Sequence, residues 1–339
     1  MKTTKRTLSK TIKKTSKILI SAILILGVIL LITKNPISDV SQIKHEIKPS
    51  SEKLKETVTK VSGLEGRNPD NLQALNATKN FIYEEWTKQG YKITEQKYTV
   101  KNTLGQEVEV ANLIVSYNSD ETKEQKTVVV GAHYDVYDKL PGADDNASGL
   151  AGLLELTRLV MQEKPKLNHR LEFVAYTLEE PPYYDTKDMG SYVHAKSMKE
   201  AGRDISLMIS LEMIGYFSNE ENSQNYPIPL LNKLYSDRGN FITIVGAFKE
   251  LFISRKAKTY FQMMTDLPVF SINTTRYMEG IDWSDHRSYW DFGYPALMIT
   301  DTSFLRNKNY HQATDTFEKL DYEQMAKVVL GTYGIITNF

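Results

Sequence analysis

Six short apolar runs in the last two-thirds of the chain restrict its fold more than any other feature. They read TVVVGA, RLEFVAYT, ISLMISL, FITIVG, PVFSI and PALMIT, and helical patterns separate several of them. Continuous apolar runs of this length are typical of strands that are buried on both faces of a sheet. The pattern therefore predicts an α/β fold, a single domain with a mixed, mostly parallel central sheet flanked by helices.

The region before these runs adds a helix and two strands to the predicted domain. Asn68 is a suitable N-cap for a helix that begins at Pro69 and ends near Gly90. Strands are expected over residues 91–100 and 106–117, on either side of a turn at KNTLG. A further helix is expected to close the domain from about residue 321.

Imidazole and carboxylate side chains follow four of the apolar runs at or just after their ends. They are His133 and Asp135, Glu179 and Glu180, Glu212, and Asp301 with His311 ten residues later. In open α/β sheets, ligands bind outside the carboxyl ends of the strands, where loops from several strands converge. We therefore expect these side chains to meet at one edge of the sheet.

The segment from Asp135 to Asp145 contains four aspartates within eleven residues, next to His133. Burying even one carboxylate costs several kcal/mol unless a partner compensates its charge. Two metal ions that share one carboxylate would provide that compensation. Histidine and carboxylate ligands without any thiolate suit zinc, manganese or cobalt. Small residues in PGADDNASG would let the backbone turn tightly before a helix from about Ser148 to Met161.

The motifs GAHYDV, PGADDNASG, LEE, SLEM and YHQATDT together resemble those of the M28 peptidases, the co-catalytic zinc exopeptidases that include bacterial leucyl aminopeptidase-like enzymes. The resemblance runs from about residue 67 to the C-terminus. It implies two zinc ions per chain, with Mn²⁺ or Co²⁺ as alternatives. By that resemblance, His133, Asp145 and Glu212 would hold one ion. Asp145, Glu180 and His311 would hold the other, with Asp145 bridging the two.

The same resemblance assigns the catalytic roles. Hydrolysis of an N-terminal peptide bond would use a water activated by two zinc ions, with Glu179 as the general base. Asp135 would orient His133. Because neighbouring residues of a regular strand point to opposite faces, Glu179 and Glu180 can serve one site only if their strand ends before them. Pro181 and Pro182 favour such an ending.

Two further segments concern the surroundings of the predicted site. The continuation LEEPPYYDTKDMG after the paired glutamates departs from the commoner glycine-containing pattern of the family, which affects substrate preference rather than the metal site. The segment WSDHRSYWDFGYPA also resembles a family segment, and we expect its Asp285 and His286 to face the substrate or to support the metal ligands.

The N-terminus begins with a basic leader and an apolar segment. Residues 1–17 carry seven of the 42 Lys and Arg residues and no acid, and residues 18–32 carry no charge. As a helix this run would span roughly 22 Å, against the ~30 Å hydrocarbon core of a bilayer. We expect a signal anchor over residues 18–33, which would make this a single-pass protein of the cell membrane with an extracytoplasmic catalytic domain. A cleaved secretory signal and a buried helix are the alternatives.

These features divide the chain into a cytoplasmic leader (1–17), the transmembrane or signal segment (18–33), a linker (34–60) that is either a stalk or a short helical spacer, and the metallopeptidase domain (61–339). Beyond the leader the chain carries 35 basic against 42 acidic residues, which argues against a nucleic-acid partner. The chain has no cysteine, so disulfides and thiolate ligands are excluded.

The expected function is a zinc aminopeptidase that acts on peptides, with its oligomeric state left open. A glutaminyl cyclase is the main rival among enzymes, and a one-metal site of that kind would need only Asp145, Glu180 and His311. The presence of His133 and Glu212 argues against it. A carboxypeptidase or an amide deacylase stays open, because the sequence does not place the specificity loops. A non-catalytic surface binding module is the rival from another class.

Overall fold

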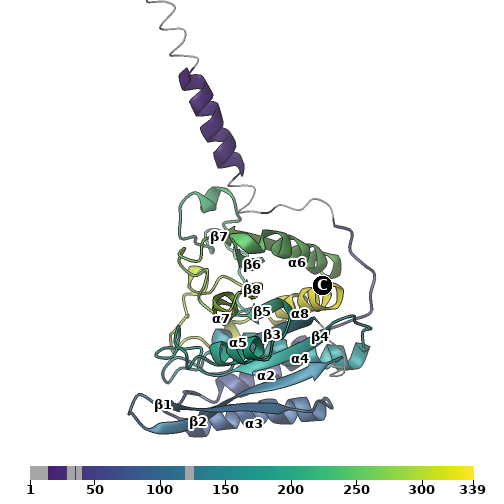
Figure 1. Ribbon diagram of the computed structural model, residues 1–339, viewed down its shortest axis with the longest axis vertical. Coiled ribbons are helices and arrows are strands. Elements are labelled where there is room, and N and C mark those ends of the chain that lie inside the picture. The colour runs from purple at the N-terminus through teal and green to yellow at the C-terminus, as the bar shows by residue number, and fades with distance from the viewer. Residues whose placement is uncertain (1–13, 29–34, 36–39, 119–125) are drawn as a thin grey trace, which may run out of the picture.

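The computed structural model describes residues 14–28, 35, 40–118 and 126–339 (Figure 1). Its described strands form one mixed sheet in the order β1-β2-β4-β3-β5-β8-β6-β7. The strands are β1 (Thr94–Lys101), β2 (Glu107–Tyr117), β3 (Thr127–His133), β4 (Arg170–Tyr176), β5 (Ile205–Leu211), β6 (Ile242–Ala247), β7 (Val269–Thr274) and β8 (Ala296–Thr300). All six apolar runs are strands, as predicted.

The direction of the strands determines where their ends lie. β4, β3, β5 and β8 run parallel to one another at the centre of the sheet. β2 pairs antiparallel with β4 and β1, and β6 pairs antiparallel with β8 and parallel with β7. The prediction of one α/β domain with a mixed sheet is confirmed. The carboxyl ends of the four central strands lie at one edge.

Helices cover both faces of this sheet. Residues of α2, α3, α4, α6 and α8 join the larger buried cluster on one face, and residues of α5 and α7 join a smaller cluster on the other. The bounds are α2 (Ser51–Ser62), α3 (Leu72–Lys88), α4 (Gly149–Glu163), α5 (Gly190–Glu200), α6 (Leu251–Met264), α7 (His286–Asp291) and α8 (Tyr322–Asn338).

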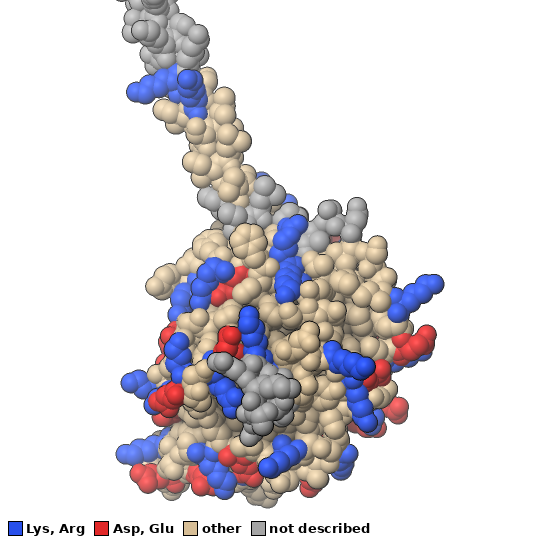
Figure 2. All heavy atoms as spheres, turned by 45° about the vertical axis from the view of Figure 1, so that its right-hand side comes forward, with Lys and Arg blue, Asp and Glu red and all other residues tan. Residues whose placement is uncertain are grey.

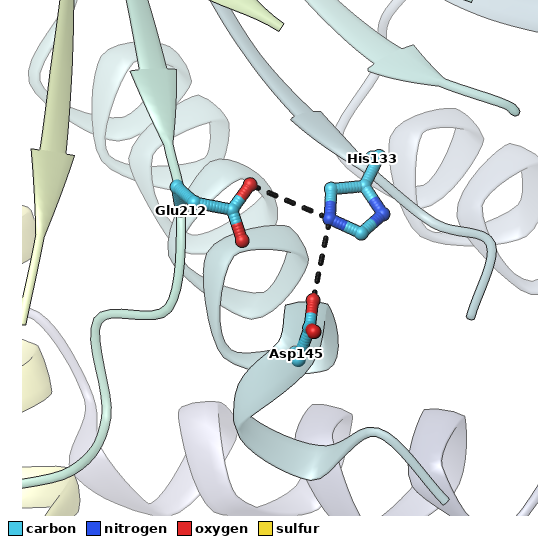
Figure 3. Close-up of side chains that lie close together, drawn as sticks. All are labelled: His133, Asp145 and Glu212. Atoms are coloured by element: carbon cyan, nitrogen blue, oxygen red, sulfur yellow. Dashed lines mark ion pairs between the residues drawn. The ribbon is translucent and has the colours of Figure 1, made fainter. Parts of the chain in front are cut away.

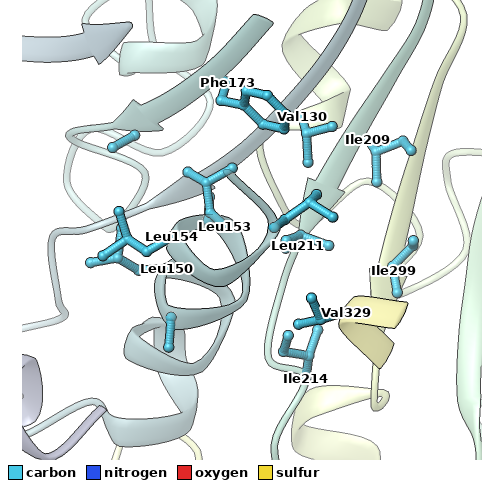
Figure 4. Close-up of a cluster of buried hydrophobic side chains, with 14 of the residues drawn as sticks. Val130, Leu150, Leu153, Leu154, Phe173, Ile209, Leu211, Ile214, Ile299 and Val329 are labelled. Carbon is cyan, nitrogen blue, oxygen red and sulfur yellow. The ribbon is translucent and has the colours of Figure 1, made fainter. Parts of the chain in front are cut away.

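Alternation along the strands decides which residues reach which cluster. In β3, Val128 and Val130 belong to the larger cluster and Val129 to the smaller one. This is the two-residue period of a strand that is buried on both faces. Figure 4 shows the larger cluster, where Leu153 of α4 points toward Phe173 of β4 and Val130 of β3. The core therefore fixes α4 directly behind the carboxyl ends of the strands.

The beginning of α3 differs from its prediction. The helix starts at Leu72 with Asn71 as N-cap, and the Asn71 side chain accepts the amide of Ala74 at 3.3 Å. Asn68 instead donates to the carbonyl of Asp138 at 2.6 Å. Asn68 is therefore recruited to hold the loop that follows β3, and the N-cap moves three residues along the chain.

α2 lies in the segment that the sequence analysis assigned to a linker. A helix is present, but it is not a spacer, because Leu54, Val58 and Val61 are fully buried in the larger cluster. The segment has an apolar stripe spaced at three and four residues, which the polar residues around it obscured. The packed body therefore begins near Ser51.

The N-terminal segment is described only in part. Residues 14–28 are helical, whereas residues 1–13 of the predicted leader and residues 29–33 of the predicted apolar segment lie outside the described residues. In the part of the chain that the structure describes, no helix combines the length and apolar character needed to cross a membrane.

The surface of the body carries mixed charge. On the face shown in Figure 2, Lys and Arg side chains are interspersed with Asp and Glu side chains. Opposite charges that alternate in this way do not form the continuous basic stripe that phosphate backbones require.

Candidate metal centre

The ends of three parallel strands bring the predicted ligands together. His133 is the last residue of β3, and Glu212 directly follows β5. Glu180 comes four residues after the end of β4. Because β3 lies between β4 and β5, these three side chains converge above β3. Figure 3 shows two of them, His133 and Glu212, together with Asp145.

A tight loop before α4 supplies Asp145. Gly142 has a φ of +55°, and a Cβ at this position would lie 2.2 Å from the carbonyl oxygen of Asp145. A Cβ on Gly149 would lie 2.2 Å from the Asn146 side chain. Both positions therefore require glycine for steric reasons. The small residues of PGADDNASG serve the close turn that the sequence predicted.

Arg67 and Asp315 hold this loop from opposite sides. The fully buried Arg67 donates from Nη2 to the carbonyl of Gly142 at 2.7 Å and from Nε to the carbonyl of Tyr134 at 3.0 Å. Burial lowers the pKa of Arg67 to about 10, so it keeps its charge at neutral pH. The carboxylate of Asp315 accepts the amides of Asp144 and Asp145 at 3.0 to 3.1 Å.

The two oxygens of Asp145 face different histidines. Oδ1 lies 3.5 Å from Nε2 of His133, and Oδ2 lies 3.1 Å from Nε2 of His311. His133 Nε2 also lies 3.4 Å from Glu212 Oε2, and His311 Nε2 lies 3.2 Å from Glu180 Oε2. Two three-residue groups share Asp145, and within each group the ligand atoms lie within 4.8 Å of one another. This is the arrangement that a bridging carboxylate requires.

The unpartnered nitrogens indicate that these groups fit metal ions. Nε2 of His133 and Nε2 of His311 are buried and have no hydrogen-bond partner within the described residues. Buried polar atoms are almost always satisfied. Each of these nitrogens faces two carboxylates, and a divalent cation would be bound by all three side chains. The donor set of imidazole and carboxylate suits zinc.

The charges of the metal-free site support the same interpretation. Burial lowers the pKa of His311, but Asp145 and Glu180 outweigh it and raise that pKa to about 10. Burial, followed by the charge of Asp145, raises the pKa of Glu180 to about 7. In the absence of metal the cluster therefore holds protons that a cation would displace.

Proton release is therefore expected when metal binds. Ligands must be deprotonated to bind zinc. Both pKa values are raised, so these protons are bound at low pH and lost as the pH passes the raised values. Metal affinity should rise with pH between 6 and 9, by about tenfold per pH unit for each proton released. Titration calorimetry in phosphate and in Tris buffers measures the proton count, and an enthalpy that does not depend on the buffer would contradict the expectation.

Glu179 and Glu180 can serve one site because β4 ends at Tyr176. Leu178 then takes a φ of +61°, which turns the chain before the two glutamates. Glu180 reaches the second group, while Glu179 Oε2 lies 3.9 Å from His133 Nε2. Both glutamates line a cavity beside the ligands. The early strand end that the two prolines predicted is confirmed.

Asp135 connects His133 to this turn. Its carboxylate lies 3.4 Å from His133 Nδ1, and it accepts the amides of Glu179 and Glu180 at 3.1 Å each. One carboxylate therefore lies beside the imidazole and fixes the backbone of the two glutamates. The sequence predicted the first of these contacts but not the second.

His311 lies on a loop, where aromatic rings hold it. Its ring stacks between Tyr137, with a centroid distance of 4.5 Å, and Tyr310, at 3.9 Å. Its φ of +53° turns the backbone at this residue. Aromatic stacking thus positions His311, whereas His133, Glu180 and Glu212 are positioned by the ends of strands.

Asp285 and His286 have different surroundings. Asp285 is fully buried, neither of its carboxylate oxygens has a hydrogen-bond partner within the described residues, and burial raises its pKa to about 7. His286 pairs through Nε2 with the carbonyl of Ile281 at 2.8 Å and packs against Trp290. Neither residue lines the cavity.

Ser284, which precedes Asp285 in the chain, donates to Glu212 at 2.7 Å and holds that carboxylate in place.

Asp144 and Asp301 stay outside the candidate groups. Asp144 accepts the amide of Gly215 at 3.0 Å and the Asn307 side chain at 2.8 Å. Asp301 accepts the amide of Tyr216 at 2.8 Å. Both carboxylates therefore tie loops together.

Sequence reasoning missed Arg67, Asp315 and Ser284. Asp315 lies inside the quoted YHQATDT motif, four residues after His311, so its position was a usable signal. His194 is buried, and its Nδ1 shares a hydrogen bond of 2.6 Å with the hydroxyl of Tyr289. Nothing in the sequence around His194 indicated the buried tyrosine.

A cavity of about 300 Å³ lies beside the two groups. Asp145, Glu179, Glu180, Glu212 and His311 form one of its walls. The rest is mainly aromatic and aliphatic, with Tyr184, Tyr226, Leu231, Tyr235, Phe241, Val245, Phe270, Ile272, Trp283, Met298, Phe304 and Tyr310 among the lining residues. Tyr184 and Tyr310 line this cavity, whereas Tyr183 does not.

Sequence comparison agrees with the motifs. Residues 112–333 match the family model described as Peptidase family M28. The Escherichia coli (strain K12) protein YfbL, described as uncharacterized, is 42% identical over 85% of this chain and 88% of its own length. Leucine aminopeptidase 1 from Uncinocarpus reesii is 28% identical over 62% of this chain, and the match spans about half (51%) of that enzyme's length.

Solved structures share the fold. LapB from Legionella pneumophila matches with a TM-score of 0.65 at 21% identity, covering 90% of this chain and 78% of LapB. A glutaminyl cyclase from Bacteroides thetaiotaomicron matches with a TM-score of 0.64 at 18% identity, covering 86% of this chain and 99% of the cyclase. Because the family model covers well over half of the sequence, the chain belongs to peptidase family M28, and the prediction that it is a metallopeptidase is confirmed.

Proposed function

We propose that this protein is a zinc aminopeptidase that removes apolar residues from the N-terminus of peptides. The observation that carries the proposal is the charge of the cavity wall. Five carboxylates, Asp145, Glu179, Glu180, Glu212 and Glu279, line the cavity, and its lining among the described residues includes no Lys or Arg. Two zinc ions would compensate the charges of Asp145, Glu180 and Glu212, which leaves Glu179 and Glu279 to attract the ammonium group of a peptide N-terminus. The C-terminal carboxylate that a carboxypeptidase must bind would find no Lys or Arg among the described lining residues.

The rest of the cavity supports a preference for apolar side chains. Phe241, Val245, Phe270 and Met298 lie on strands or at their ends, so the walls are rigid. A cavity of about 300 Å³ is of the size that a single large side chain and its backbone fill. Leucine, methionine and phenylalanine are therefore the expected first residues of the substrate.

The residues of the chain divide the catalytic work. When bound, two zinc ions would supply Lewis acidity, which polarises the scissile carbonyl and lowers the pKa of the attacking water. Glu179 is placed to take a proton from that water and to deliver it to the leaving amine. Burial raises the pKa of Glu179, which favours a carboxylate that can hold the proton during the reaction. Asp135 acts through His133 and the Glu179 backbone as a positioning residue.

Blocking the substrate amine tests the direction of cleavage. Leucyl-p-nitroanilide should be hydrolysed, and N-acetyl-leucyl-p-nitroanilide should lose about 10- to 100-fold in kcat/KM, since a charge-assisted hydrogen bond is worth about 1.5–3 kcal/mol. Glycyl-p-nitroanilide is the control for the apolar pocket and should also react more slowly. Equal rates for the free and acetylated substrates would point to an amide deacylase instead.

The glutaminyl cyclase is the second candidate, because a solved cyclase has this fold. Its one-metal chemistry would leave His133 and Glu212 without a metal to bind. The unpartnered Nε2 of His133, 3.4 Å from Glu212, favours a second ion and hence hydrolysis. A non-catalytic binding module would have no need for Glu179. Formation of pyroglutamate from glutaminyl peptides, measured by mass spectrometry, distinguishes the cyclase.

We also propose that the N-terminal segment anchors the protein in the cell membrane, with the catalytic domain on the extracytoplasmic side. Residues 18–32 carry no charge, and large apolar side chains of the described part, among them Leu19, Leu24 and Ile25, are about 60% exposed. Exposed apolar side chains around a helix are favourable only in lipid. The basic leader favours a cytoplasmic N-terminus. Carbonate extraction of membranes tests the anchor, and intact mass of the mature chain distinguishes it from a cleaved signal.

A further inference from the structure

We propose that the catalytic domain docks on the bilayer through the β7 edge of its sheet, an inference that rests on the membrane anchor proposed above. The docking surface consists of Ile228, Leu230, Phe248 and Phe252. These four side chains lie on two segments on either side of β7, and none of them lines the catalytic cavity. The occupant is the interfacial region of a phospholipid bilayer.

The chain that leaves the apolar segment is attached to the domain at once. Asn35 comes three residues after Ile32, the last residue of the apolar run, and it is only 3% exposed. Its Nδ2 donates to the carbonyl of Leu251 at 2.9 Å, and Lys258 donates to its carbonyl at 3.2 Å. Three residues reach at most ~10 Å. With residues 18–32 in the bilayer, Asn35 lies within that distance of the apolar segment, and its side chain contacts the first turn of α6.

The following residues keep the chain on the same helix. The amide of Ile43 donates to the carbonyl of Met263 at 2.8 Å, and His45 pairs through Nε2 with the carbonyl of Met264 at 2.9 Å. Asn35 is therefore held at the beginning of α6, and Ile43 and His45 are held at its end. A chain tied at both ends of a helix leaves the domain little freedom to swing away from the membrane. In Figure 1, β7 and α6 lie at the end of the body next to the helical segment 14–28.

The exposed side chains at this place are the types found at membrane interfaces. Phe252 is 80% exposed and Phe248 is 51% exposed, although both begin a segment that packs on the core. Ile228 and Leu230 are 42% and 45% exposed. Lys249 lies beside the two phenylalanines. Aromatic and aliphatic side chains insert about 5–10 Å into the boundary between headgroups and acyl chains, and neighbouring lysines approach the phosphates.

β7 joins the two halves of this surface. Tyr235, which follows Ile228 and Leu230, donates to the carbonyl of Ser271 in β7 at 2.8 Å. From α6, Lys258 reaches the side chain of the same Ser271 at 3.5 Å. β7 is an edge strand of the described sheet, so it lies at the end of the sheet that this surface covers. Tyr226, Pro227 and Leu231, which lie on the segment of Ile228 and Leu230, also line the cavity. Docking therefore places one wall of the cavity at the membrane surface.

Site-specific fluorescence quenching tests the docking in the full-length chain. Because the chain has no cysteine, single-cysteine variants can each be labelled with bimane and reconstituted in vesicles of phosphatidylethanolamine and phosphatidylglycerol with nitroxide-labelled phospholipid. Phe252→Cys and Phe248→Cys report on the docking surface. Leu104→Cys is the matched control, since Leu104 is 74% exposed on the β1–β2 turn, at the opposite edge of the sheet. Ile25→Cys reports on the anchor.

The expected result is loss of fluorescence at positions 25, 248 and 252 and none at position 104, with leucyl-p-nitroanilide hydrolysis unchanged in all four variants. Loss at position 25 with positions 248 and 252 as bright as position 104 would overturn docking while the anchor stands. Full fluorescence at position 25 would overturn the anchor, and docking with it. Aminopeptidase activity is measured separately, so failure of that proposal is recognised independently.

Discussion

Replacing Glu179 by glutamine should reduce kcat by about 10²- to 10⁴-fold, the usual contribution of a general base, and leave the metal content unchanged. The amide has the size of the carboxylate but cannot accept the proton of the attacking water. Glu179 lines the cavity and belongs to neither of the two groups that share Asp145. Steady-state kinetics with leucyl-p-nitroanilide and elemental analysis of the same preparation measure both quantities.

The neighbouring residue provides the matched comparison. Glu180→Gln changes the same chemical group one position further along the chain, but Glu180 belongs to the group with Asp145 and His311. This variant should lose metal as well as activity. If Glu179→Gln also lost metal, or kept ordinary activity, Glu179 would not be the general base.

Asp145→Asn should have the largest effect on the site, because Asp145 is the one residue common to both groups. Its two oxygens lie 3.5 Å and 3.1 Å from the two histidines, so an amide would weaken both sites at once. We expect turnover to fall to background and metal content to fall below one equivalent. Metal that is present at 100 times its Kd stabilises a fold by about 2.7 kcal/mol per site, and the variant should lose this stabilisation too.

Asp144→Asn is the control for this change. Asp144 is equally buried but accepts the Gly215 amide and the Asn307 side chain rather than facing a histidine. Burial raises its pKa, so the neutral asparagine resembles its protonated form. Thermal unfolding with and without chelator should show a metal-dependent shift for Asp144→Asn and none for Asp145→Asn. A metal-dependent shift of wild-type size in Asp145→Asn would contradict the bridging role.

The central sheet and the ligand positions could be predicted because they depend on local sequence. A buried strand is visible as a short apolar run, and its end is visible as the first charged residue. His133 and Glu212 were found in this way. The convergence of these ends needs only that β3, β4 and β5 are parallel neighbours, which the alternation of strands and helices indicated. The bridging role of Asp145 came from resemblance to the family and not from spacing.

The supporting contacts could not be predicted because they join distant parts of the chain. Arg67 holds the loop at Gly142, and Asp315 accepts the amide of Asp145, 170 residues away in sequence. A single charged residue carries no local sign of such a partner. Asn68 illustrates the same limit. It is a good N-cap by composition, but the structure uses its side chain to hold the loop after β3.

α2 was assigned to the linker because polar residues outnumber apolar ones between residues 48 and 60. Its three buried residues are sufficient to pack it against the larger cluster, where it closes the body on the side of the metal-site loop. Average composition hides such a helix, whereas the spacing of Leu54, Val58 and Val61 indicates it.

The number of metal ions per chain tests the central claim most directly. The full-length protein is purified in detergent, loaded with zinc and then freed of excess metal. Inductively coupled plasma mass spectrometry gives the zinc concentration, and amino-acid analysis gives the protein concentration. Their ratio is the number of zinc ions per chain. Two groups that share Asp145 predict two zinc ions per chain. One ion per chain would contradict the co-catalytic site and favour the cyclase, and no bound metal would contradict the mechanism altogether.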